Sequence, residues 1–276
     1  MNNKNLNFKS WLVGFTDGDG TFKININKTK VIYEYNITQN KNKEQLLHKI
    51  KKELKVGKII KYNNKVSYII RDKRHIERVI FPIFDKYPLL SHKYYDYIKF
   101  KECLLINNDL TLSQKDKLLK IKYISINNMP KDYISPIWNN INYNNIKSIN
   151  DIKDKISKSW LTGFIEAKGR FIINKDRDRY IHIFSISSLD PIIIYSIKYI
   201  FHINAKVKHK EIFNMIETAN SRNINNIIRY FIKSNNKNIF YGIKSYEFNL
   251  WKKSYLNYRN NNSKLCKIQQ SINRFI

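Results

Sequence analysis

Glycine, proline, cysteine and acidic residues are all scarce in this chain. Its 276 residues include 7 glycines, 5 prolines and 2 cysteines. The cysteines, Cys103 and Cys266, form no Cys-x-x-Cys pair, so we expect two reduced thiols rather than a zinc site or a disulfide framework. No apolar run reaches the roughly 18–20 residues that a membrane span needs, and residues 1–9 hold no apolar stretch typical of a secretory signal.

Acidic residues are far outnumbered by basic ones. The chain has 51 Lys and Arg against 22 Asp and Glu, a formal net charge of +29, and its hydrophobic content of 42% is enough for a packed core. A compact protein with this much self-repulsion is expected to bind a polyanion. Nucleic acid is the first candidate. An anionic membrane surface is a weaker one, because the sequence has neither an amphipathic basic helix nor a lipidation motif.

Asparagine, lysine, isoleucine and tyrosine are used unusually often; there are 19 tyrosines. This bias follows from A/T-rich codons and is typical of organellar coding sequences. We therefore expect an organelle-encoded protein of the mitochondrial matrix.

The opening segment of the chain recurs about halfway along it. Residues 11–15 read WLVGF and residues 160–164 read WLTGF, an offset of 149 (160 − 11). The similarity continues at nearly the same offset in three later pairs of segments: 37–39 with 186–188, 74–80 with 222–228, and 93–101 with 244–252. Such repetition indicates duplication of one unit of roughly 100 residues.

Each copy is expected to fold in the order αββαββα. Thr21–Lys28 alternates apolar and polar side chains, as a half-buried strand does, and Val31–Gln39 is a second strand. Glu44–Val56 has apolar residues at helical spacing, Gly57 ends that helix, and Asn63-Asn64 predicts a hairpin turn. The second copy predicts strands at 170–174 and 180–187, a helix over 191–201 and a hairpin over 205–217.

The repeats predict four parts of the chain. They are a first repeat at 6–107, a linker at 108–156, a second repeat at 157–258 and a basic C-terminal tail at 259–276. The linker is inferred from Ser135-Pro136 and from an Asn-rich stretch at 139–150.

Each repeat opens with a related motif, LVGFTDGDG at 12–20 and LTGFIEAKG at 161–169. Small residues four apart lie on one helix face and permit two backbones to approach closely. We expect the helices at 11–20 and 160–169 to pack on each other about a pseudo-twofold axis; the alternative is a tight helix–strand contact within each repeat. The small residues are Gly14 and Gly18 in the first copy and Gly163 and Ala167 in the second.

The ends of these helices carry predicted caps and one unusual acid. Ser10 and Ser159 are the predicted N-caps, and Gly20 and Gly169 are the predicted C-cap glycines. Asp19 lies at the end of a helix where the macrodipole is already negative, so it calls for a compensating cation. A divalent ion such as Mg²⁺ would satisfy this electrostatic demand and would suit phosphodiester hydrolysis.

The paired motifs resemble those of the single-chain LAGLIDADG homing endonucleases and RNA maturases encoded in organellar introns. The resemblance covers both repeats. It implies an α+β fold in which two αββαββα repeats form a pseudo-twofold saddle of antiparallel sheets, with the motif helices at the interface. It also implies a monomer that binds a long double-stranded DNA site or group I intron RNA, with Mg²⁺ as the cofactor.

The same resemblance implies catalytic residues. Asp19 matches the acid that binds the metal, and Gln39 is similar to the residue that orients water in relatives. Lys93 and Lys244 resemble lysines that stabilise charge near the scissile phosphates. In the second repeat Lys168 stands at the degenerate position where relatives hold the matching acid. We therefore expect nicking of one strand, or no cleavage, rather than efficient cleavage of both.

Basic and amide side chains alternate along predicted strands and mark a nucleic-acid-binding face. Strands can lie in the major groove of duplex DNA, where Asn contacts adenine and Lys contacts guanine. Other lysines would neutralise phosphates in a salt-dependent way. The predicted contact residues are Lys23, Asn25 and Asn27 in one strand, Arg170 in another, and Lys206, Lys208 and Lys210 in a third.

Three functions remain open from the sequence. The first is an intron-homing DNA endonuclease with cleavage weakened by Lys168. The second is an RNA maturase that assists splicing of its host group I intron without cutting DNA. The third is a remnant that serves as a structural component of a ribonucleoprotein particle.

Overall fold

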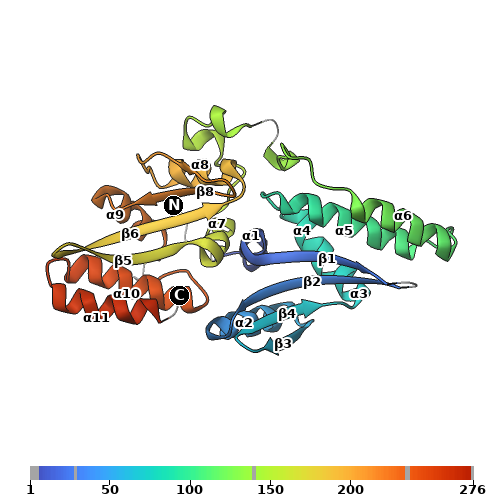
Figure 1. Ribbon diagram of the computed structural model, residues 1–276, viewed down its shortest axis with the longest axis horizontal. Coiled ribbons are helices and arrows are strands. Elements are labelled where there is room, and N and C mark those ends of the chain that lie inside the picture. The colour runs from blue at the N-terminus through green and yellow to red at the C-terminus, as the bar shows by residue number, and fades with distance from the viewer. Residues whose placement is uncertain (1–5, 28–29, 139–140, 234–236, 275–276) are drawn as a thin grey trace. The chain divides into compact units, whose positions relative to one another are not determined.

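The computed structural model describes residues 6–27, 30–138, 141–233 and 237–274. The chain folds into two bodies: one contains Met1–Gly18 and Asn140–Ile276, the other Asp19–Asn139. Each body holds one four-stranded antiparallel sheet with helices packed on it (Figure 1). This confirms the predicted α+β fold class. Within the described residues no helix is long and apolar enough to cross a membrane.

The body formed by Asp19–Asn139 is built around the sheet β1-β2-β4-β3. One face of this sheet is apolar: Phe22 of β1 packs against Tyr35 of β2, Phe84 and Phe100. The strands are β1 (Gly20–Ile26), β2 (Val31–Asn40), β3 (Lys58–Tyr62) and β4 (Lys65–Ile70). The helices are α2 (Glu44–Leu54), α3 (Lys73–His75), a π-helical turn (Ile76–Ile80), α4 (Phe81–Lys86), α5 (Lys93–Asn108) and α6 (Gln114–Ile126), with short 3₁₀ turns at Lys41–Lys43 and Pro136–Trp138.

The other body contains the sheet β5-β6-β8-β7, which repeats the strand order of the first. Its core face carries Phe171, which packs against Phe184, Phe248 and Trp251. The strands are β5 (Arg170–Asp176), β6 (Arg179–Ser188), β7 (Lys208–His209) and β8 (Asn214–Thr218). The helices are α1 (Phe8–Asp19), α7 (Lys158–Lys168), α8 (Pro191–Ile200), α9 (Ser221–Tyr230), α10 (Ile243–Asn257) and α11 (Asn262–Asn273), with 3₁₀ turns at Tyr143–Asn145 and Ile149–Asp151.

The strand and turn predictions agree with the structure apart from their ends and apart from the first strand of the second hairpin, β7, which has only 2 residues. The predicted αββαββα order is present in both copies. The hairpin at Asn63-Asn64 connects β3 to β4, with Asn63 at a φ of 44°. Lys28 and Asn139, at the ends of a predicted strand and a predicted linker stretch, lie outside the described residues.

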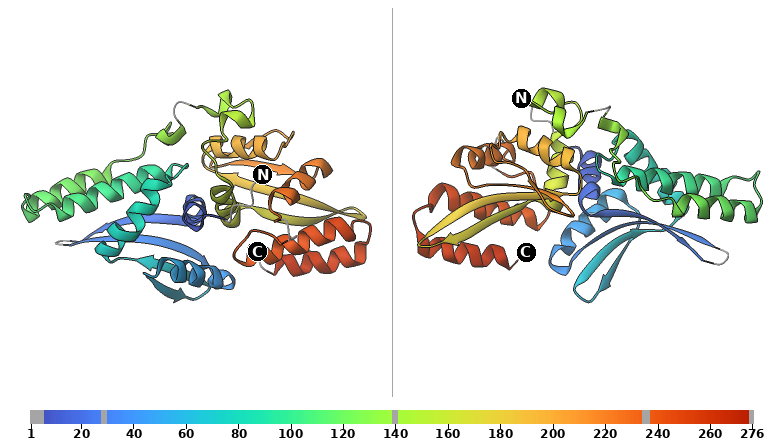
Figure 2. Two further views of the ribbon diagram at one scale, coloured as in Figure 1. Left: turned by 180° about the vertical axis from the view of Figure 1, so that it is seen from behind. Right: turned by 45° about the horizontal axis from the view of Figure 1, so that its top comes forward.

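Two helices lie where the sequence predicted a linker and a tail. In one body α6 packs on α5, and in the other α11 packs on α10, β5 and β6 (Figure 2). Leu265 and Ile272 of α11 are fully buried. The two helices share a short pattern, LLKI at 118–121 and LCKI at 265–268. The predicted boundaries of repeats, linker and tail stay predictions, and these matched helices favour a repeat that extends further than we expected.

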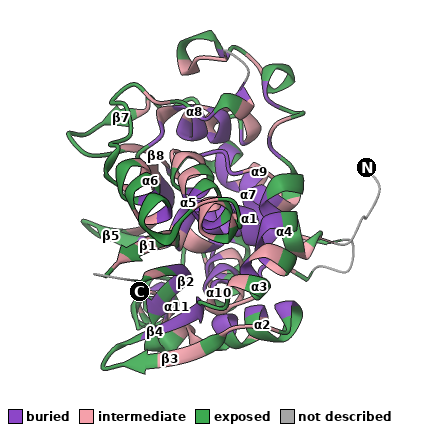
Figure 3. Ribbon diagram, turned by 90° about the vertical axis from the view of Figure 1, so that its right-hand side faces the viewer, coloured by how far each residue is buried: buried purple, intermediate pink, exposed green. Residues whose placement is uncertain are grey.

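The two motif helices, α1 and α7, pack against each other at their small residues, and Figure 3 shows both as buried. A Cβ added at Gly14 would lie 1.9 Å from the carbonyl oxygen of Trp160, and one at Gly163 would lie 1.9 Å from that of Trp11. A Cβ at Gly18 would lie 2.3 Å from the Cβ of Ala167. The prediction of helix-on-helix packing is therefore confirmed, and the alternative of a helix–strand contact is wrong.

Reciprocal hydrogen bonds join the same two helices. Trp11 Nε1 donates to Glu166 at 3.0 Å, and Trp160 Nε1 donates to Asp17 at 2.7 Å. Glu166 also accepts from the backbone N–H groups of Tyr241 and Gly242, which precede α10. Its carboxylate is buried, and this desolvation raises the pKa of Glu166 from 4.5 to about 7 despite the three donors.

Of the predicted helix caps, Gly169 is confirmed, whereas the predicted N-caps Ser10 and Ser159 were wrong. Helix α7 begins earlier than expected, with Ser157 as its N-cap accepting from Trp160 N–H, and Asn7 Oδ1 accepts from Ser10 N–H at the start of α1. Ser10 instead hydrogen-bonds to Ser157 across the helix pair. Gly169 is a C-cap in an extended conformation, where a Cβ would lie 2.6 Å from the Ile165 side chain. Gly20 is the first residue of β1 and not a left-handed cap.

We predict that Gly163→Ala lowers the free energy of unfolding by at least about 2 kcal/mol, because the added methyl overlaps the Trp11 carbonyl and forces the helices apart. Denaturant titration measures this. Leu256→Ala, at an exposed position of α10, is the control and should change stability by no more than roughly 0.5 kcal/mol. Equal effects of the two substitutions would contradict the close packing.

We predict that stability falls as pH rises through the range in which Glu166 ionises. The folded pKa of about 7 lies above the ordinary 4.5, so the protonated form favours folding. This contribution is complete below pH 4.5 and is lost as pH passes about 7, by up to about 3 kcal/mol. Thermal unfolding measured from pH 4.5 to 8 should show the decline. In Glu166→Gln that part of the slope should vanish; an unchanged slope would refute the assignment.

Candidate catalytic and nucleic-acid-binding site

Two of the predicted catalytic residues lie together in the structure. Asp19 is the last residue of α1, and Gln39 lies near the end of β2. Gln39 Nε2 donates to Asp19 Oδ2 at 2.6 Å, and the Gln39 side chain is nearly buried. The register of the first sheet explains this proximity, because Gly20, next to Asp19, pairs with Ile37. The carboxylate is therefore held in one orientation at the point where helix gives way to strand.

Lys93 begins helix α5, which packs against β1 in the same body. Its backbone N–H donates to Ser91 Oγ at 3.2 Å, and its residue is half-buried. Lys93 therefore lies on the helix that contacts β1, the strand that begins directly after Asp19. Its catalytic role stays a prediction.

The matching lysine of the second repeat has different surroundings. Lys244 is 5% exposed, and its Nζ donates to Gly169 O at 2.7 Å and to Glu247 Oε2 at 2.8 Å. Glu247 Oε1 in turn accepts from Phe171 N–H at 3.0 Å. Lys244 and Glu247 thus hold the corner between α7 and β5, which gives this lysine a structural task that the sequence did not indicate.

The end of the second motif is exposed and basic. Lys168 is the last residue of α7 and lies on the surface, where its positive charge suits the negative end of the helix dipole. Ser188, which matches Gln39, accepts a hydrogen bond from Asp190 N–H at 3.1 Å. The residues of the second repeat therefore differ from Asp19 and Gln39 in both charge and contact.

No cluster of three or more His, Cys, Asp or Glu side chains suitable for a metal ion occurs in the described part of the chain. We therefore consider Asp19 as a single protein ligand of a metal ion. Mg²⁺ commonly takes only one or two carboxylates and completes its shell with waters and substrate phosphates. The donor set at Asp19 fits a metal held jointly with a phosphate.

The predicted binding residues of β1 and β5 lie where the sequence expected them. Lys23 and Asn25 are exposed and alternate with the inward-facing Phe22 and Ile24 of β1, and Asn27 follows the strand, also exposed. Arg170 is the exposed first residue of β5. The alternation confirms that these side chains lie on the face of the sheet opposite its apolar core; their contact with nucleic acid stays a prediction.

The three lysines near β7 do not share one strand face. Strand β7 contains only Lys208 and His209, so Lys206 precedes it and Lys210 follows it. Lys210 N–H bonds to Phe213 O in the turn, and Lys208 Nζ pairs with Glu217 at 2.9 Å. The expectation of a long strand was wrong, because lysine-rich segments have weak strand propensity and few of these residues find a partner in β8.

Sequence reasoning missed a polar network on the first sheet. Glu34 of β2 is 4% exposed and is bonded to Arg71 and Asn36. The alternation of Tyr33, Tyr35 and Ile37 with Glu34 and Asn36 could have indicated that these polar residues share a face with Lys23. No sequence signal joined Glu34 to Arg71, since they are brought together only by strand pairing.

The chain is similar to known intron-encoded proteins. The family model described as LAGLIDADG endonuclease matches residues 12–104. A probable intron-encoded endonuclease of Schizosaccharomyces pombe, Cox1-I1b, is 35% identical over 90% of this chain and 64% of its own length. An uncharacterized mitochondrial protein of Saccharomyces cerevisiae, RF1, is 34% identical over 62% of this chain and 34% of its own length. The chain thus spans less than two thirds of the length of both relatives.

Solved structures share the fold. The LAGLIDADG homing endonuclease I-GzeII, in complex with its DNA target, superimposes with a TM-score of 0.77 at 23% identity, covering 97% of this chain and 98% of that one. I-SmaMI, bound to an uncleaved DNA target in the presence of calcium ions, gives a TM-score of 0.70 at 24% identity, covering 97% of each chain. These similarities show that residues 12–104 match the LAGLIDADG endonuclease family, and that the repeated motif and the strand order of both halves belong to a fold shared with solved LAGLIDADG structures.

Proposed function

We propose that the chain is an intron-encoded DNA endonuclease that binds a long duplex site and hydrolyses a phosphodiester bond at Asp19. The observation that carries the proposal is the 2.6 Å hydrogen bond that orients Asp19 through Gln39 at the end of α1. The Gln39 side chain is buried, so the hydrogen bond that it donates fixes the direction of the Asp19 carboxylate. The strong positive charge of +29 fits a polyanionic substrate.

Mg²⁺ is the proposed metal, held by Asp19 together with the substrate phosphate. When bound, the ion supplies charge neutralisation at the scissile phosphate and lowers the pKa of a coordinated water. Asp19 contributes the carboxylate ligand, and its negative charge at a helix C-terminus favours a cation there. The family uses divalent metals, and the related I-SmaMI structure was obtained with calcium ions.

The neighbouring residues orient the reactants. Gln39 donates through Nε2 to Asp19, so its carbonyl oxygen can accept a hydrogen bond from the attacking water. Lys93, at the start of α5, is proposed to stabilise the negative charge that develops on the phosphate. The chain acts as a monomer in this proposal, with each repeat binding one half of a pseudo-palindromic duplex site.

We infer that this endonuclease nicks one strand. In the second repeat Lys168 replaces the metal-binding acid, and a lysine cannot donate a lone pair to Mg²⁺ while protonated. Lys244 Nζ is committed to Gly169 O and Glu247, so it is poorly placed to meet a phosphate. Both observations disfavour a second catalytic centre.

The binding surface is proposed to be the outer faces of both sheets. Lys23, Asn25, Asn27 and Arg170 are exposed there, and Lys206, Lys208 and Lys210 are exposed around the β7–β8 turn. Their positive charges would neutralise phosphates, and Asn25 could contact adenine. We place the protein in the mitochondrial matrix, because relatives are intron-encoded and one is named as mitochondrial.

We predict that Asp19→Asn lowers the rate of nicking by at least about 100-fold while duplex binding persists, because the amide keeps the shape but cannot hold the metal with a charge. The assay uses a supercoiled plasmid carrying the intronless insertion site, with Mg²⁺, and labels each strand separately. Lys168→Gln is the control and should leave the nicked strand unchanged. Cutting of both strands by the unmodified chain would refute the single-centre proposal; no cutting at all would refute the endonuclease.

A maturase function is the second candidate, and the basic Lys168 is the observation that favours it, since splicing assistance needs a basic surface and no metal-binding acid. On this view Asp19→Asn should leave excision of the host group I intron at its original rate. A splicing assay with the intron RNA and either protein measures this. If the intron is excised equally well without any protein, the maturase function is contradicted.

A further inference from the structure

A row of charged residues crosses the outer face of the sheet β1-β2-β4-β3, the face opposite Phe22 and Tyr35. Lys23 of β1 pairs with Glu34 of β2, and Arg71 follows Ile70, whose partner in β2 is Tyr35, next to Glu34. The acid therefore lies between two cations of neighbouring strands. Glu34 is only 4% exposed, although it stands on the face that we propose binds a polyanion.

Hydrogen bonds hold this acid and Arg71 in a fixed arrangement. Arg71 donates to Glu34 Oε2 through Nε at 2.7 Å and through Nη2 at 2.7 Å. Asn36 Nδ2 donates to Glu34 Oε1 at 2.9 Å, and Asn36 Oδ1 accepts from Thr38 Oγ1 at 3.0 Å. Both carboxylate oxygens are thus occupied. A carboxylate repels phosphate, so its presence here requires a task other than affinity, and the geometry indicates that the task is orientation of Arg71.

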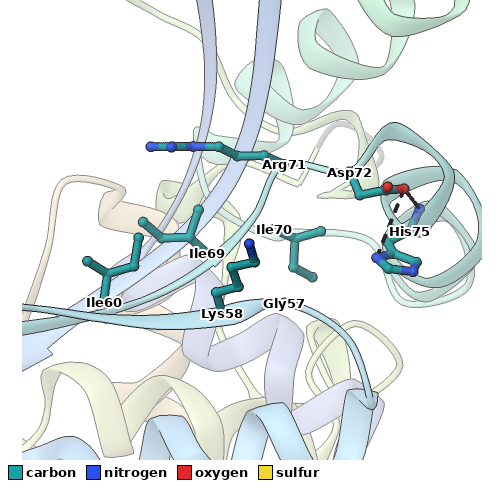
Figure 4. A pocket seen from close by; sticks show the side chains of 8 residues that line it. All are labelled: Gly57, Lys58, Ile60, Ile69, Ile70, Arg71, Asp72 and His75. Carbon is teal, nitrogen blue, oxygen red and sulfur yellow. Dashed lines mark hydrogen bonds and ion pairs between the residues drawn. The ribbon is translucent and has the colours of Figure 1, made fainter.

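This arrangement leaves the far edge of the guanidinium turned away from Glu34. Arginine has five N–H donors in a rigid plane. Glu34 takes the side formed by Nε and Nη2, so the remaining donors on Nη1 and Nη2 point along the side chain. The Arg71 side chain is 57% exposed, and in Figure 4 it extends away from Asp72 and His75. Two parallel donors presented end-on match O6 and N7 of guanine.

A pocket adjoins Arg71 on the same face. It has a volume of about 370 Å³, and isoleucines form its apolar part. Lys58 and Ile60 alternate with the opposite-facing Ile59 and Lys61 of β3, and Lys58 pairs with Ile69. Figure 4 shows the lining: Gly57, Lys58, Ile60, Ile69, Ile70, Arg71, Asp72 and His75. An apolar surface next to a base-contacting arginine suits the methyl group of thymine, which projects into the major groove.

We propose that this pocket is a base-recognition site in which Arg71 contacts a guanine and Ile60 and Ile69 contact the methyl of a neighbouring thymine. Glu34 is the positioning residue of Arg71. The proposal rests on the proposed function, since it assigns part of the target of that same protein. The ligand is duplex DNA, because the deep, narrow major groove of A-form RNA does not admit side chains on a sheet.

The matched control lies on the opposite face of the same sheet. Lys61 of β3 pairs with Glu44 of α2 at 2.5 Å, and both belong to the same body as Arg71 and Glu34. Removal of either control residue changes the net charge by the same amount as removal of Arg71 or Glu34. Lys61→Ala and Glu44→Gln therefore report the effect of charge alone.

The experiment selects bound sequences from a randomised pool of duplex DNA, without added metal, using the unmodified chain, Arg71→Ala, Glu34→Gln and the two controls. We expect the unmodified chain to enrich a site with at least one guanine fixed. In Arg71→Ala the preference for that guanine should fall by about tenfold or more, with other positions unchanged. In Glu34→Gln the same preference should weaken while total binding to duplex stays equal or rises. The controls should retain the full preference.

A second measurement tests the pocket itself. Replacement of the thymine beside that guanine by uracil removes only the methyl, and should weaken binding of the unmodified chain by a few-fold. In Ile60→Ala the two oligonucleotides should bind equally. Equal binding of both by the unmodified chain would overturn the thymine assignment.

The outcomes separate the inference from the function on which it rests. If the unmodified chain enriches no duplex sequence, the proposed function fails. If it enriches a site but Arg71→Ala and Glu34→Gln keep every base preference, the function stands and the recognition site is refuted. Tighter binding to an RNA duplex of the selected sequence than to DNA would also overturn the inference.

Discussion

The close approach of α1 and α7 is the constraint on which the rest of this structure depends. Glycine at 14 and 163 permits each helix to lie against the carbonyl of a tryptophan on the other, and the same tryptophans donate across the pair to Asp17 and Glu166. These contacts bury two carboxylates that would be costly without their donors. The motif therefore contains two kinds of acid: the earlier one joins the helices, and the later one ends the helix where chemistry is proposed.

Because the two acids of the motif have different roles, the second motif can lose the later acid and keep the earlier one. Glu166 fixes the segment before α10 through Tyr241 and Gly242 as well as Trp11, so its removal would disturb both the helix pair and α10. Lys168 is exposed at the end of α7, where a positive charge suits the negative end of the helix dipole. A lysine is therefore compatible with the fold at 168, whereas at 166 it would place a cation among buried hydrogen-bond donors.

The sequence predicted the elements better than the contacts. Small residues at helical spacing and strict alternation in β1 are local signals, and both helix packing and the outer face of that strand followed from them. The caps at Ser10 and Ser159 were wrong because several serines and asparagines precede each motif and tertiary contacts choose among them. The burial of Lys244 and the Glu34–Arg71 pair were not predictable, since each depends on strand and helix neighbours that are distant in sequence.

The two sheets share a strand order but differ in what their outer faces carry. On the first sheet, the buried Glu34 directs Arg71 outward and joins Asn36, Thr38 and Ser67 in one hydrogen-bonded network. On the second, Glu217 of β8 accepts a hydrogen bond from Lys208, and Ile172 faces Ile183, so the acid of that face is paired with a lysine and not with an arginine. A planar arginine held by an acid presents a fixed pair of donors to a base, whereas a lysine is a point charge that suits a phosphate. If the first half carries both Asp19 and the oriented arginine, cleavage and the strictest sequence recognition belong to the same half of the molecule, and the second half is free to diverge toward general affinity.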